Sequence, residues 1–399
     1  MPAMSDLLTM EEALALVLER VRPLPAERVP LAEAAGRVLA EEVRAAVDLP
    51  PFRSSAMDGF AVHAADTPGT LPVGGRVAAG RPAERPLSAG ETMGIATGAV
   101  VPDGADSVVP LEFVVDRENS VEFPDGIEAG KNVRPVGGDV RAGEVVLTAG
   151  TALSAAHLGA AAAVGVAEVT CSRRPRVAVL STGTELRRPG EELGPGQIYE
   201  SNSVLLAAAA VAAGAEVERL EPVADDEAAH REALARGLDA DVFVSSGGVS
   251  VGPHDLVRSA GGELGVEEVF WRVAVKPGKP VSFGVREGTL VFGLPGNPVS
   301  ALVGFELFVR PALRALQGIP DPGPRFLWAR LAAPLRRLSS RDQLVRARTS
   351  VADGELLLQP LSGQDSHMIV RAAAADSLVH VPRGEGELAA GVTVRYLPL

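Results

Sequence analysis

The sequence predicts a multidomain protein that combines an α/β part with β parts, and three observations carry this prediction. The chain has 399 residues, which is enough for about two to four domains with cores of their own. Strand-like and helix-like runs alternate between residues 176 and 318, as in a parallel sheet with crossover helices. Short Val-rich runs punctuated by Gly and Pro fill residues 72–150 and recur after 320, which indicates β modules on both sides.

The N-terminal region is expected to be helical. Apolar residues recur at helical spacing over 10–21, and residues 31–40 predict a second short helix. An Ala-rich run over 154–166 predicts a third helix. The polar stretch 53–59 follows two prolines and is expected to form a loop that serves a site or a tight turn. The pattern changes near residue 175, where we expect a domain boundary.

The amino-acid composition excludes several classes of binding partner and site. A net charge of −13 argues against broad binding of a nucleic-acid backbone, which needs clustered Lys and Arg. Cys171 is the only cysteine, which excludes an intramolecular disulfide and a cysteine-cluster metal site. The N-terminus lacks a signal-peptide layout, and no apolar run reaches membrane-spanning length. We therefore expect a cytoplasmic protein that binds neither nucleic acid nor a membrane.

Three strands of the α/β part are predicted to end in Gly-rich loops, near residues 181, 246 and 294. In open α/β sheets ligands bind outside the carboxyl ends of the strands, so the loops locate the expected site. One such loop is a weak signal, but three in one domain favour a site. Backbone N–H groups of Gly247 and Gly248 can approach an oxyanion closely. Hydroxyl side chains in comparable positions could bind a phosphate or a pterin edge, and a simple turn explains each of them equally well; these are Thr97, Ser181, Thr182 and Thr184.

The segment KPGKP, residues 276–280, places two ammonium groups three residues apart across a Pro-Gly turn. This arrangement suits a compact dianion held by point charges. Two solvated surface lysines are the alternative. We favour the anion site, because the turn lies between two hydrophobic strand-like runs, where a lysine pair is unusual. The sequence therefore predicts that Lys276 and Lys279 hold a small anion.

Five carboxylates follow strand-like runs in Gly-containing or capping contexts: Asp58, Asp139, Glu185, Asp225 and Asp255. Each alone is more often a cap or turn former. Their recurrence beside the Gly loops suggests that some hold Mg²⁺ together with phosphate oxygens. The six histidines, including His254 and His367, show no metal-ligand spacing, and we expect no catalytic role for them. No catalytic-triad order, Walker loop or dinucleotide fingerprint is present, which excludes most hydrolases, kinases and dinucleotide-dependent enzymes.

The chain resembles the molybdopterin molybdenumtransferases, the bacterial MoeA proteins and the related E domain of gephyrin. The resemblance covers nearly the whole chain and rests on motifs in the order and approximate spacing of that family. These motifs are PPFRSSAMDGFAV, TGAVVPDGADSVV, STGTEL, SSGGVSVGPHD, KPGKPVSFG, GLPGNPVSA and GQDSHM.

The resemblance implies a fold of four parts. Residues 1–46 and 150–174 would form an N-terminal helical, elongated domain, with an inserted β domain at 47–149. Residues 175–319 would form a molybdopterin-binding-like parallel α/β domain, and 320–399 a C-terminal β barrel. The family also implies a homodimer whose active site lies between the α/β domain of one subunit and the inserted β domain of the other.

The implied activity is insertion of molybdate into adenylylated molybdopterin with release of AMP, the final, Mg²⁺-dependent step of molybdenum cofactor synthesis. The residues that match catalytic positions are Asp58, Asp225, Asp255, Lys276 and Lys279. Those that match substrate-binding positions are Thr97, Ser181, Thr182, Gly183, Gly247, Gly248, Ser250, Pro280, Pro295, Asn297, Arg341 and Ser366. Those that match metal-binding positions are Asp139, Glu185 and Asp255.

Arg341 stands in a stretch that departs from the family pattern. The family usually has Gly before this arginine and Phe and Gly shortly after it, where this chain has Ser340, Leu344 and Ala347. The neighbouring Arg346 or Arg348 is therefore an alternative contact for the anion.

Two other functions remain open at this level. The first is another reaction on the same α/β domain, such as the adenylyltransferase of this pathway or a relative of the competence-damage proteins, although those proteins generally lack the N-terminal insertion and the barrel. The second is a scaffold, as the gephyrin E domain also is, and transient contacts with other cofactor-synthesis proteins would fit either role. The lysine pair recognises charge, so molybdate and tungstate are not distinguished.

Overall fold

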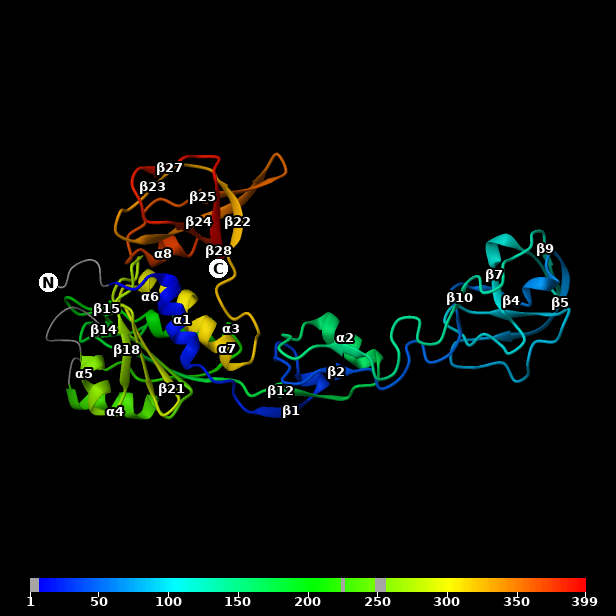
Figure 1. The fold of residues 1–399 in the computed structure, drawn as a ribbon, viewed down its shortest axis with the longest axis horizontal. Coiled ribbons are helices and arrows are strands. Elements are labelled where there is room, and N and C mark those ends of the chain that lie inside the picture. The colour runs from blue at the N-terminus through cyan, green and yellow to red at the C-terminus, as the bar shows by residue number, and fades with distance from the viewer. Residues whose placement is uncertain (1–6, 224–226, 248–255) are drawn as a thin grey trace. The chain divides into compact units, whose positions relative to one another are not determined.

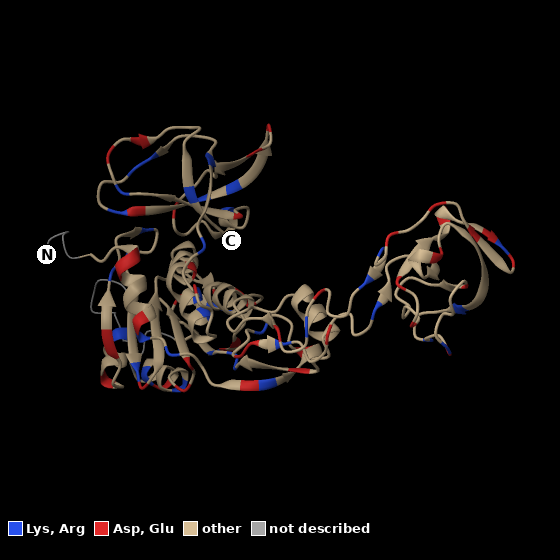
Figure 2. Cartoon of the chain, turned by 45° about the vertical axis from the view of Figure 1, so that its right-hand side comes forward, with Lys and Arg blue, Asp and Glu red and all other residues tan. Residues whose placement is uncertain are grey.

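The computed structural model describes residues 7–223, 227–247 and 256–399. Two compact units divide the chain. The first unit comprises Met1–Glu27, Gly36–Ala40 and Cys171–Leu399, and the second comprises Arg28–Ala35 and Glu41–Thr170. Among the residues described, no helix is long and apolar enough to cross a membrane. Basic and acidic side chains are interspersed along both units (Figure 2).

A six-stranded sheet forms the centre of the first unit (Figure 1). Its strands, in spatial order, are β16 (Glu216–Arg219), β13 (Arg176–Ser181), β17 (Val242–Ser246), β21 (Thr289–Leu294), β20 (Ser282–Arg286) and β18 (Glu267–Trp271). The first four are parallel, as predicted, but at one edge β20 runs antiparallel to β21, and β18 runs antiparallel to β20. The reversal occurs because Glu287 and Gly288 both adopt positive φ, at 48° and 97°, which makes a two-residue hairpin turn.

Helices cover both faces of this sheet. They are α3 (Asn202–Ala212), α4 (Glu227–Gly237), α5 (Leu256–Glu263), α6 (Pro298–Gly304) and α7 (Arg310–Leu316). Successive residues of a strand point to opposite faces, and β13 follows this rule. Val177 and Val179 enter the core beneath α3, α6 and α7, whereas Ala178 and Leu180 enter the core beneath α4 and α5. Burial on both faces explains the continuous apolar runs in the sequence.

The long helix predicted after residue 298 forms, with an irregularity in its middle. Residues Phe305–Val309 make a π-helical segment between α6 and α7. Pro311 lacks a backbone N–H and its ring crowds the carbonyl of Leu307, so regular α-helical hydrogen bonding cannot continue through this point.

The N-terminal helix α1 (Met10–Arg20) forms as predicted, with a capping box between Thr9 and Glu12. Its buried face joins the core of the α/β sheet, whereas the sequence grouped it with residues 150–174. The second predicted helix, over 31–40, is wrong. Only a 3₁₀ turn, Leu31–Glu33, forms there, because Gly36 adopts a φ of +71° that no helix continues through.

The C-terminal strands close into a barrel, as predicted. The ring consists of β24 (Asp342–Ala352), β25 (Glu355–Pro360), β22 (Leu327–Leu331), β28 (Thr393–Pro398) and β26 (Ser377–Val381), which returns to β24. A short strand from the α/β part, β19 (Val275–Lys276), adds to β24 in parallel. Three barrel residues, Leu344, Leu378 and Leu397, are buried in the same core as the α/β sheet. The barrel and the α/β part are therefore joined by a strand pair and a common core.

The second unit is built mainly of strands, which confirms a β module in this part of the chain. Its six-stranded sheet consists of β7 (Ser107–Pro110), β4 (Gly59–Val62), β6 (Thr92–Ile95), β5 (Gly69–Val77), β9 (Ser120–Phe123) and β8 (Val115–Arg117). Shorter elements are β2 (Val43–Arg44) with β11 (Val145–Leu147), β3 (Ser54–Ser55) with β10 (Val133–Arg134), and helix α2 (Ala155–Ala163). Strands β1 (Ala26–Pro30) and β12 (Glu168–Ser172) pair with each other.

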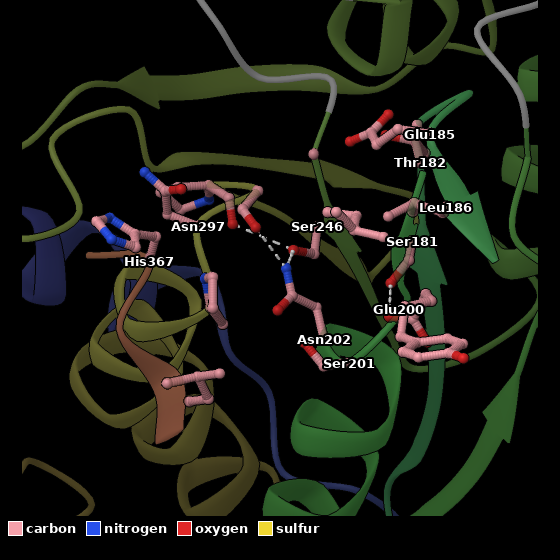
Figure 3. A pocket seen from close by; sticks show the side chains of 18 of the residues that line it. Ser181, Thr182, Glu185, Leu186, Glu200, Ser201, Asn202, Ser246, Asn297 and His367 are labelled. Carbon is pink, nitrogen blue, oxygen red and sulfur yellow. Dashed lines mark hydrogen bonds between the residues drawn. The ribbon is translucent and has the colours of Figure 1, made fainter. Parts of the chain in front are cut away.

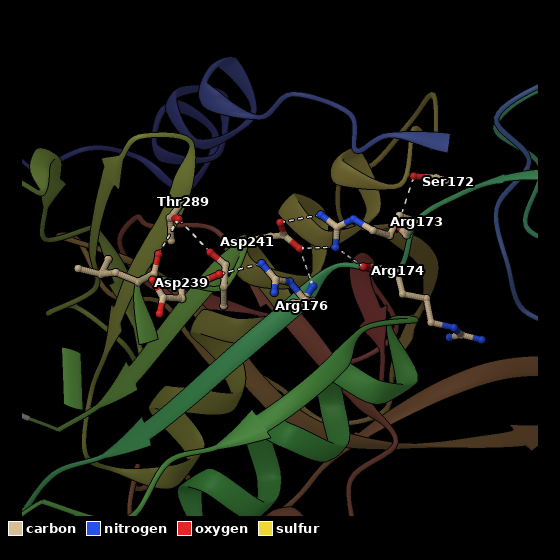
Figure 4. A network of polar contacts seen from close by, with 9 residues as sticks. Ser172, Arg173, Arg174, Arg176, Asp239, Asp241 and Thr289 are labelled. Atoms are coloured by element: carbon tan, nitrogen blue, oxygen red, sulfur yellow. Dashed lines mark hydrogen bonds and ion pairs between the residues drawn. The ribbon is translucent and has the colours of Figure 1, made fainter. Parts of the chain in front are cut away.

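A polar network fixes the chain where it enters the α/β sheet (Figure 4). Arg173 donates two hydrogen bonds to the carboxylate of Asp241, at 2.9 and 2.8 Å, and the backbone N–H of Arg176 donates a third at 2.7 Å. Burial raises the pKa of Asp241, but the hydrogen bonds from Arg173 and Arg176 outweigh it, so the net pKa lies below its ordinary value. Asp241 precedes β17, so the network aligns the starts of β13 and β17.

Candidate functional site

A cavity of about 670 Å³ lies at the carboxyl ends of β13, β17 and β21 (Figure 3). All three predicted Gly-rich loops contribute to its wall, so a cavity is present where the sequence placed the expected site. The predicted site residues that line it are Ser181, Thr182, Gly183, Glu185, Gly247, Pro280, Pro295 and Asn297. Its size suits a ligand of nucleotide or pterin dimensions.

Glu200 forms part of the cavity wall and is 2% exposed. It accepts hydrogen bonds from the Ser181 hydroxyl at 2.8 Å, the Ser203 N–H at 2.7 Å and the Ser203 hydroxyl at 2.6 Å. Three donors satisfy this buried carboxylate, and the proton of Ser181 is committed to it. Glu200 was not among the site residues predicted from the sequence. The available signal was an acidic residue directly before a helix, where free backbone N–H groups need an acceptor.

Asn202, at the start of α3, ties two of the loops together. Its side-chain N–H₂ donates to the Ser246 hydroxyl at 2.8 Å and to the Gly296 carbonyl at 2.7 Å. Ser246 in turn donates to the Pro295 carbonyl at 3.1 Å. Within the described part of the chain, the side-chain oxygen Oδ1 of Asn202 and the hydroxyl of Thr182 are buried without a hydrogen-bond partner. The cavity wall therefore holds unsatisfied polar groups, a feature typical of functional sites.

Gly247 occupies a position that admits no side chain. Its φ is +94°, and a Cβ there would stand 2.5 Å from the carbonyl oxygen of Thr182. Glycine thus lets the ends of β13 and β17 meet beside the cavity.

A loop from the barrel completes the rim. Ser366 accepts a hydrogen bond of 2.8 Å from the side chain of Asn297, and its carbonyl accepts one of 3.0 Å from the N–H of Val299. The next residue, His367, lines the cavity. The sequence singled out Ser366 as a substrate-binding residue, and this role stays a prediction. His367, for which no catalytic role was expected, lies in the cavity wall. Only the fold brings this residue, from a distant part of the chain, to the cavity.

The turn 276–280, which contains the two lysines and is called the lysine turn below, reaches the same cavity. Pro280 lines the cavity, and Gly278 lies close to the carbonyl of Ser300 in α6. Lys276 and Lys279 are not among the lining residues, and neither ammonium group pairs with any described residue. Lys276 is exposed. The structure thus brings this turn to the cavity through Pro280 and leaves both lysines without a partner among the residues described.

Arg341 lies next to the lysine turn because β19 pairs with β24. The residue after it, Asp342, is opposite Val275 and donates its backbone N–H to the Ala274 carbonyl at 3.0 Å. Leu344 and Ala347, which depart from the family pattern, are buried inside the regular strand β24. The departure therefore leaves the pairing of β24 with β19 intact, and Arg341 directly precedes the paired residues.

The two alternative arginines take other positions. Arg346 is 2% exposed and donates to the carbonyls of Gly363, Asp365 and Met368, so this guanidinium anchors a loop. Burial lowers the pKa of Arg346. Arg348 is exposed, and its backbone is opposite Gln359 in β25.

Asp58 and Thr97, from distant positions in the sequence, meet in the second unit. The N–H of Thr97 donates to Asp58 Oδ1 at 2.8 Å, and both residues are exposed. Asp139 is also exposed in this unit.

The predicted metal ligands are not assembled in the described ranges. Asp139 belongs to the second unit and Glu185 to the cavity rim of the first. No group of three or more His, Cys, Asp or Glu that could hold a metal ion occurs among the residues described. Four predicted site residues lie outside the described residues: Asp225, Gly248, Ser250 and Asp255. The metal site stays a prediction.

Comparisons with known proteins identify the family. Family models described as the MoeA N-terminal region (domain I and II), a probable molybdopterin binding domain and the MoeA C-terminal region (domain IV) match residues 8–165, 178–315 and 328–399. Molybdopterin molybdenumtransferase 2 of Mycobacterium tuberculosis is 41% identical, over 98% of this chain and 99% of its own. Molybdopterin molybdenumtransferase of Haemophilus influenzae is 35% identical, over 98% of each chain.

Solved structures agree with this relationship. The crystal structure of the molybdopterin biosynthesis MoeA protein from Pyrococcus horikoshii superposes with a TM-score of 0.86 at 28% identity, and covers 99% of this chain and 100% of its own. The match extends through the cavity, the barrel and the β unit alike. The chain therefore belongs to the MoeA family of molybdopterin molybdenumtransferases.

Proposed function

We propose that the chain transfers molybdate to adenylylated molybdopterin and releases AMP, the final step of molybdenum cofactor synthesis. The names of its relatives and the cavity at the strand ends support this proposal. One observation carries it furthest. The chain contains only three lysines among 38 basic residues, and two of them, Lys276 and Lys279, stand in the turn beside the cavity. Lysine, a compact cation, is thus nearly absent except where a small anion is expected.

In this mechanism the cavity binds the nucleotide and pterin parts of the substrate. Lys276, Lys279 and Arg341 hold molybdate as fixed positive charges, because none of them is neutralised by a described residue. Ser366 contributes a hydroxyl whose oxygen already accepts from Asn297, so its own proton remains available for an oxyanion. The protein contributes positioning and charge balance, and no side chain forms a covalent bond to the substrate.

We propose Mg²⁺ as the cofactor, and the described residues fit it in part. Glu185 is exposed on the cavity rim, and its carboxylate has no partner among them. Mg²⁺ usually takes one or two protein carboxylates, and waters and substrate phosphates supply the rest. Glu200 does not fit, because its oxygens already receive three hydrogen bonds. Bound at Glu185, the ion would polarise phosphoryl oxygens. Removal with EDTA should abolish turnover, and added Mg²⁺ should restore it.

We further propose that the chain acts as a homodimer in the cytoplasm, with Asp58 and Thr97 of one subunit completing the site of the other. Large apolar side chains are exposed in the same unit, near Asp58 in sequence or by contact: Met57 is 40% exposed and Leu111 48%. Leu111 also donates its N–H to the Asp58 carbonyl at 3.2 Å. Exposed apolar groups around polar residues are typical of an interaction surface. We propose that any contacts with other cofactor-synthesis proteins are transient.

The anion assignment is tested with Lys279→Ala, which should raise the KM for molybdate at least tenfold, an order-of-magnitude expectation for loss of a charge contact. The assay measures molybdenum-loaded cofactor and AMP at limiting molybdate. Lys279→Arg should also be impaired, because the larger guanidinium does not replace a point charge. Lys131→Ala, the third lysine, is the matched control. Normal activity of Lys279→Ala at limiting molybdate would contradict the assignment.

The shared site is tested at limiting molybdate by mixing two strongly impaired variants, Asp58→Ala and Lys279→Ala. Random reassociation should restore about a quarter of the wild-type activity, because half of the dimers are mixed and each has one intact site. No recovery after verified subunit exchange would exclude a composite site.

A further inference from the structure

The loop Leu361–Met368 surrounds a buried cation. Arg346 projects from β24 of the barrel and is among the largest fully buried side chains. Its guanidinium donates to the carbonyls of Gly363 at 2.7 Å, Asp365 at 3.1 Å and Met368 at 3.1 Å. Within the described ranges no carboxylate forms an ion pair with it, so neutral oxygens, three backbone carbonyls and the side-chain oxygen of Gln364, receive all of its hydrogen bonds.

Gln364 reinforces this attachment in both directions. Its side-chain oxygen accepts from the N–H of Arg346 at 3.0 Å and from its Nε at 3.3 Å. Its side-chain N–H₂ donates to the carbonyls of Arg346 and Leu361, at 2.9 and 2.8 Å. Gln364 therefore bonds to the backbone of β24, to the guanidinium of Arg346 and to the loop itself.

A charge buried without an ionic partner costs stability, and a hydrophobic residue would fill the same volume at less cost. The hydrogen bonds of Arg346 instead fix the position of the loop backbone. The carbonyls held by Arg346 flank Ser366 and His367 on both sides in the sequence. Ser366 contacts Asn297 and Val299 of the α/β part, and His367 lines the cavity.

We propose that Arg346 is a positioning residue, whose buried guanidinium holds the loop Leu361–Met368 in the shape that presents Ser366 to the oxyanion and His367 to the cavity. This inference rests on the proposed function. Arg346 touches no substrate and acts through Ser366. It sets the affinity for the oxyanion and leaves the rate at saturation largely unchanged.

The test uses the full-length protein and compares Arg346→Gln, Ser366→Ala and the double variant. Arg346→Gln should raise the KM for molybdate by about tenfold or more, since small misplacements of a binding group have effects of this order. The kcat at saturating molybdate should change less. The double variant should show about the same KM as the more severe single variant, because both changes remove one contact. Arg330→Gln, an exposed barrel arginine paired with Glu355, is the control and should match wild type.

Two further variants apply if Arg346→Gln does not fold. Arg346→Lys keeps the buried charge with fewer donors, and Gln364→Met removes the second attachment, so both should raise the KM for molybdate in the same direction. A folded Arg346 variant with an unchanged KM would overturn the inference, as would effects of Arg346→Gln and Ser366→Ala that multiply in the double variant. These outcomes differ from failure of the proposed function, in which the wild-type protein itself would form no molybdenum-loaded cofactor.

Discussion

The side-chain amide of Asn297 donates a hydrogen bond of 2.8 Å to the hydroxyl of Ser366, across 69 residues of sequence. Asn297 follows the last strand of the α/β sheet's parallel part, and Ser366 belongs to a loop of the barrel. The bond therefore links the two parts at the rim of the cavity.

We expect Asn297→Ala to raise the KM for molybdate several-fold, because Ser366 loses the contact that orients its hydroxyl. A single hydrogen bond of this kind contributes about 0.5–1.5 kcal/mol. Steady-state kinetics at varied molybdate measure the change. Asn119→Ala, at an exposed turn of the second unit, should leave the kinetics as in wild type. A normal KM for Asn297→Ala would show that Ser366 needs no such support.

Glu200→Gln should weaken both folding and substrate binding. The amide oxygen could take the place of Oε1, but the N–H₂ group would then face the Ser203 hydroxyl, which now donates to Oε2 and already accepts a hydrogen bond from Arg219. The cost in unfolding free energy should be about 1–3 kcal/mol, typical of a buried group left unsatisfied. Urea unfolding and the KM for adenylylated molybdopterin measure the two effects. Glu221→Gln, in an exposed ion pair with Arg188, should change the unfolding free energy by no more than about 0.5 kcal/mol.

Gly247→Ala should impair substrate binding by moving the loops apart. The new methyl group would stand 2.5 Å from the Thr182 carbonyl, at a backbone φ of +94°. Gly262→Ala is a matched control, because a Cβ in that helix meets nothing within 4 Å, and should leave binding unchanged. Isothermal titration with the substrate compares the variants. Equal affinity for both would contradict the close approach of the loops.

Stability should depend on pH through Asp241. Its pKa is lowered in the folded state, so the stabilisation is fully present above the unfolded pKa of about 4 and is lost as the pH falls through the folded value. Asp241→Asn should lower the unfolding free energy by about 1–3 kcal/mol at pH 7. The difference from wild type should shrink below about pH 4. A difference that stays constant in denaturant unfolding from pH 7 down to pH 3 would show that the charge of Asp241 is not the cause.

The parts of the fold that local patterns encode were predictable from the sequence. Strands β13, β17 and β21 show continuous apolar runs that end in Gly-rich loops, and these features located the cavity. The antiparallel edge was missed because its only local sign is the pair Glu287 and Gly288. The contacts of β19 with β24 join residues some 67 positions apart, from Val275 to Asp342, and no local pattern announces such a pairing.

Some residues of the candidate site were predictable from the sequence, and others were not. Lys276, Ser366 and the glycines stand in motifs that can be recognised by residue type. Glu200, Asn202 and Arg346 act by holding other groups in place, and their partners become neighbours only in the folded chain. A buried arginine in a strand looks like an exposed one in the sequence, because alternation alone does not reveal which face is covered.

Strand β19 belongs to the α/β part and pairs with β24 of the barrel. The barrel is therefore unsuitable as an exchangeable module. Leu344, Leu378 and Leu397 share a core with the α/β sheet, so a chain cut after residue 319 would leave apolar surface and an unpaired strand edge exposed to water. Recombination between relatives at that boundary would separate each barrel from the residues that shaped it. A viable chimaera must inherit Val275 and Lys276 together with β24, which makes the turn 276–280 and the barrel a single heritable unit.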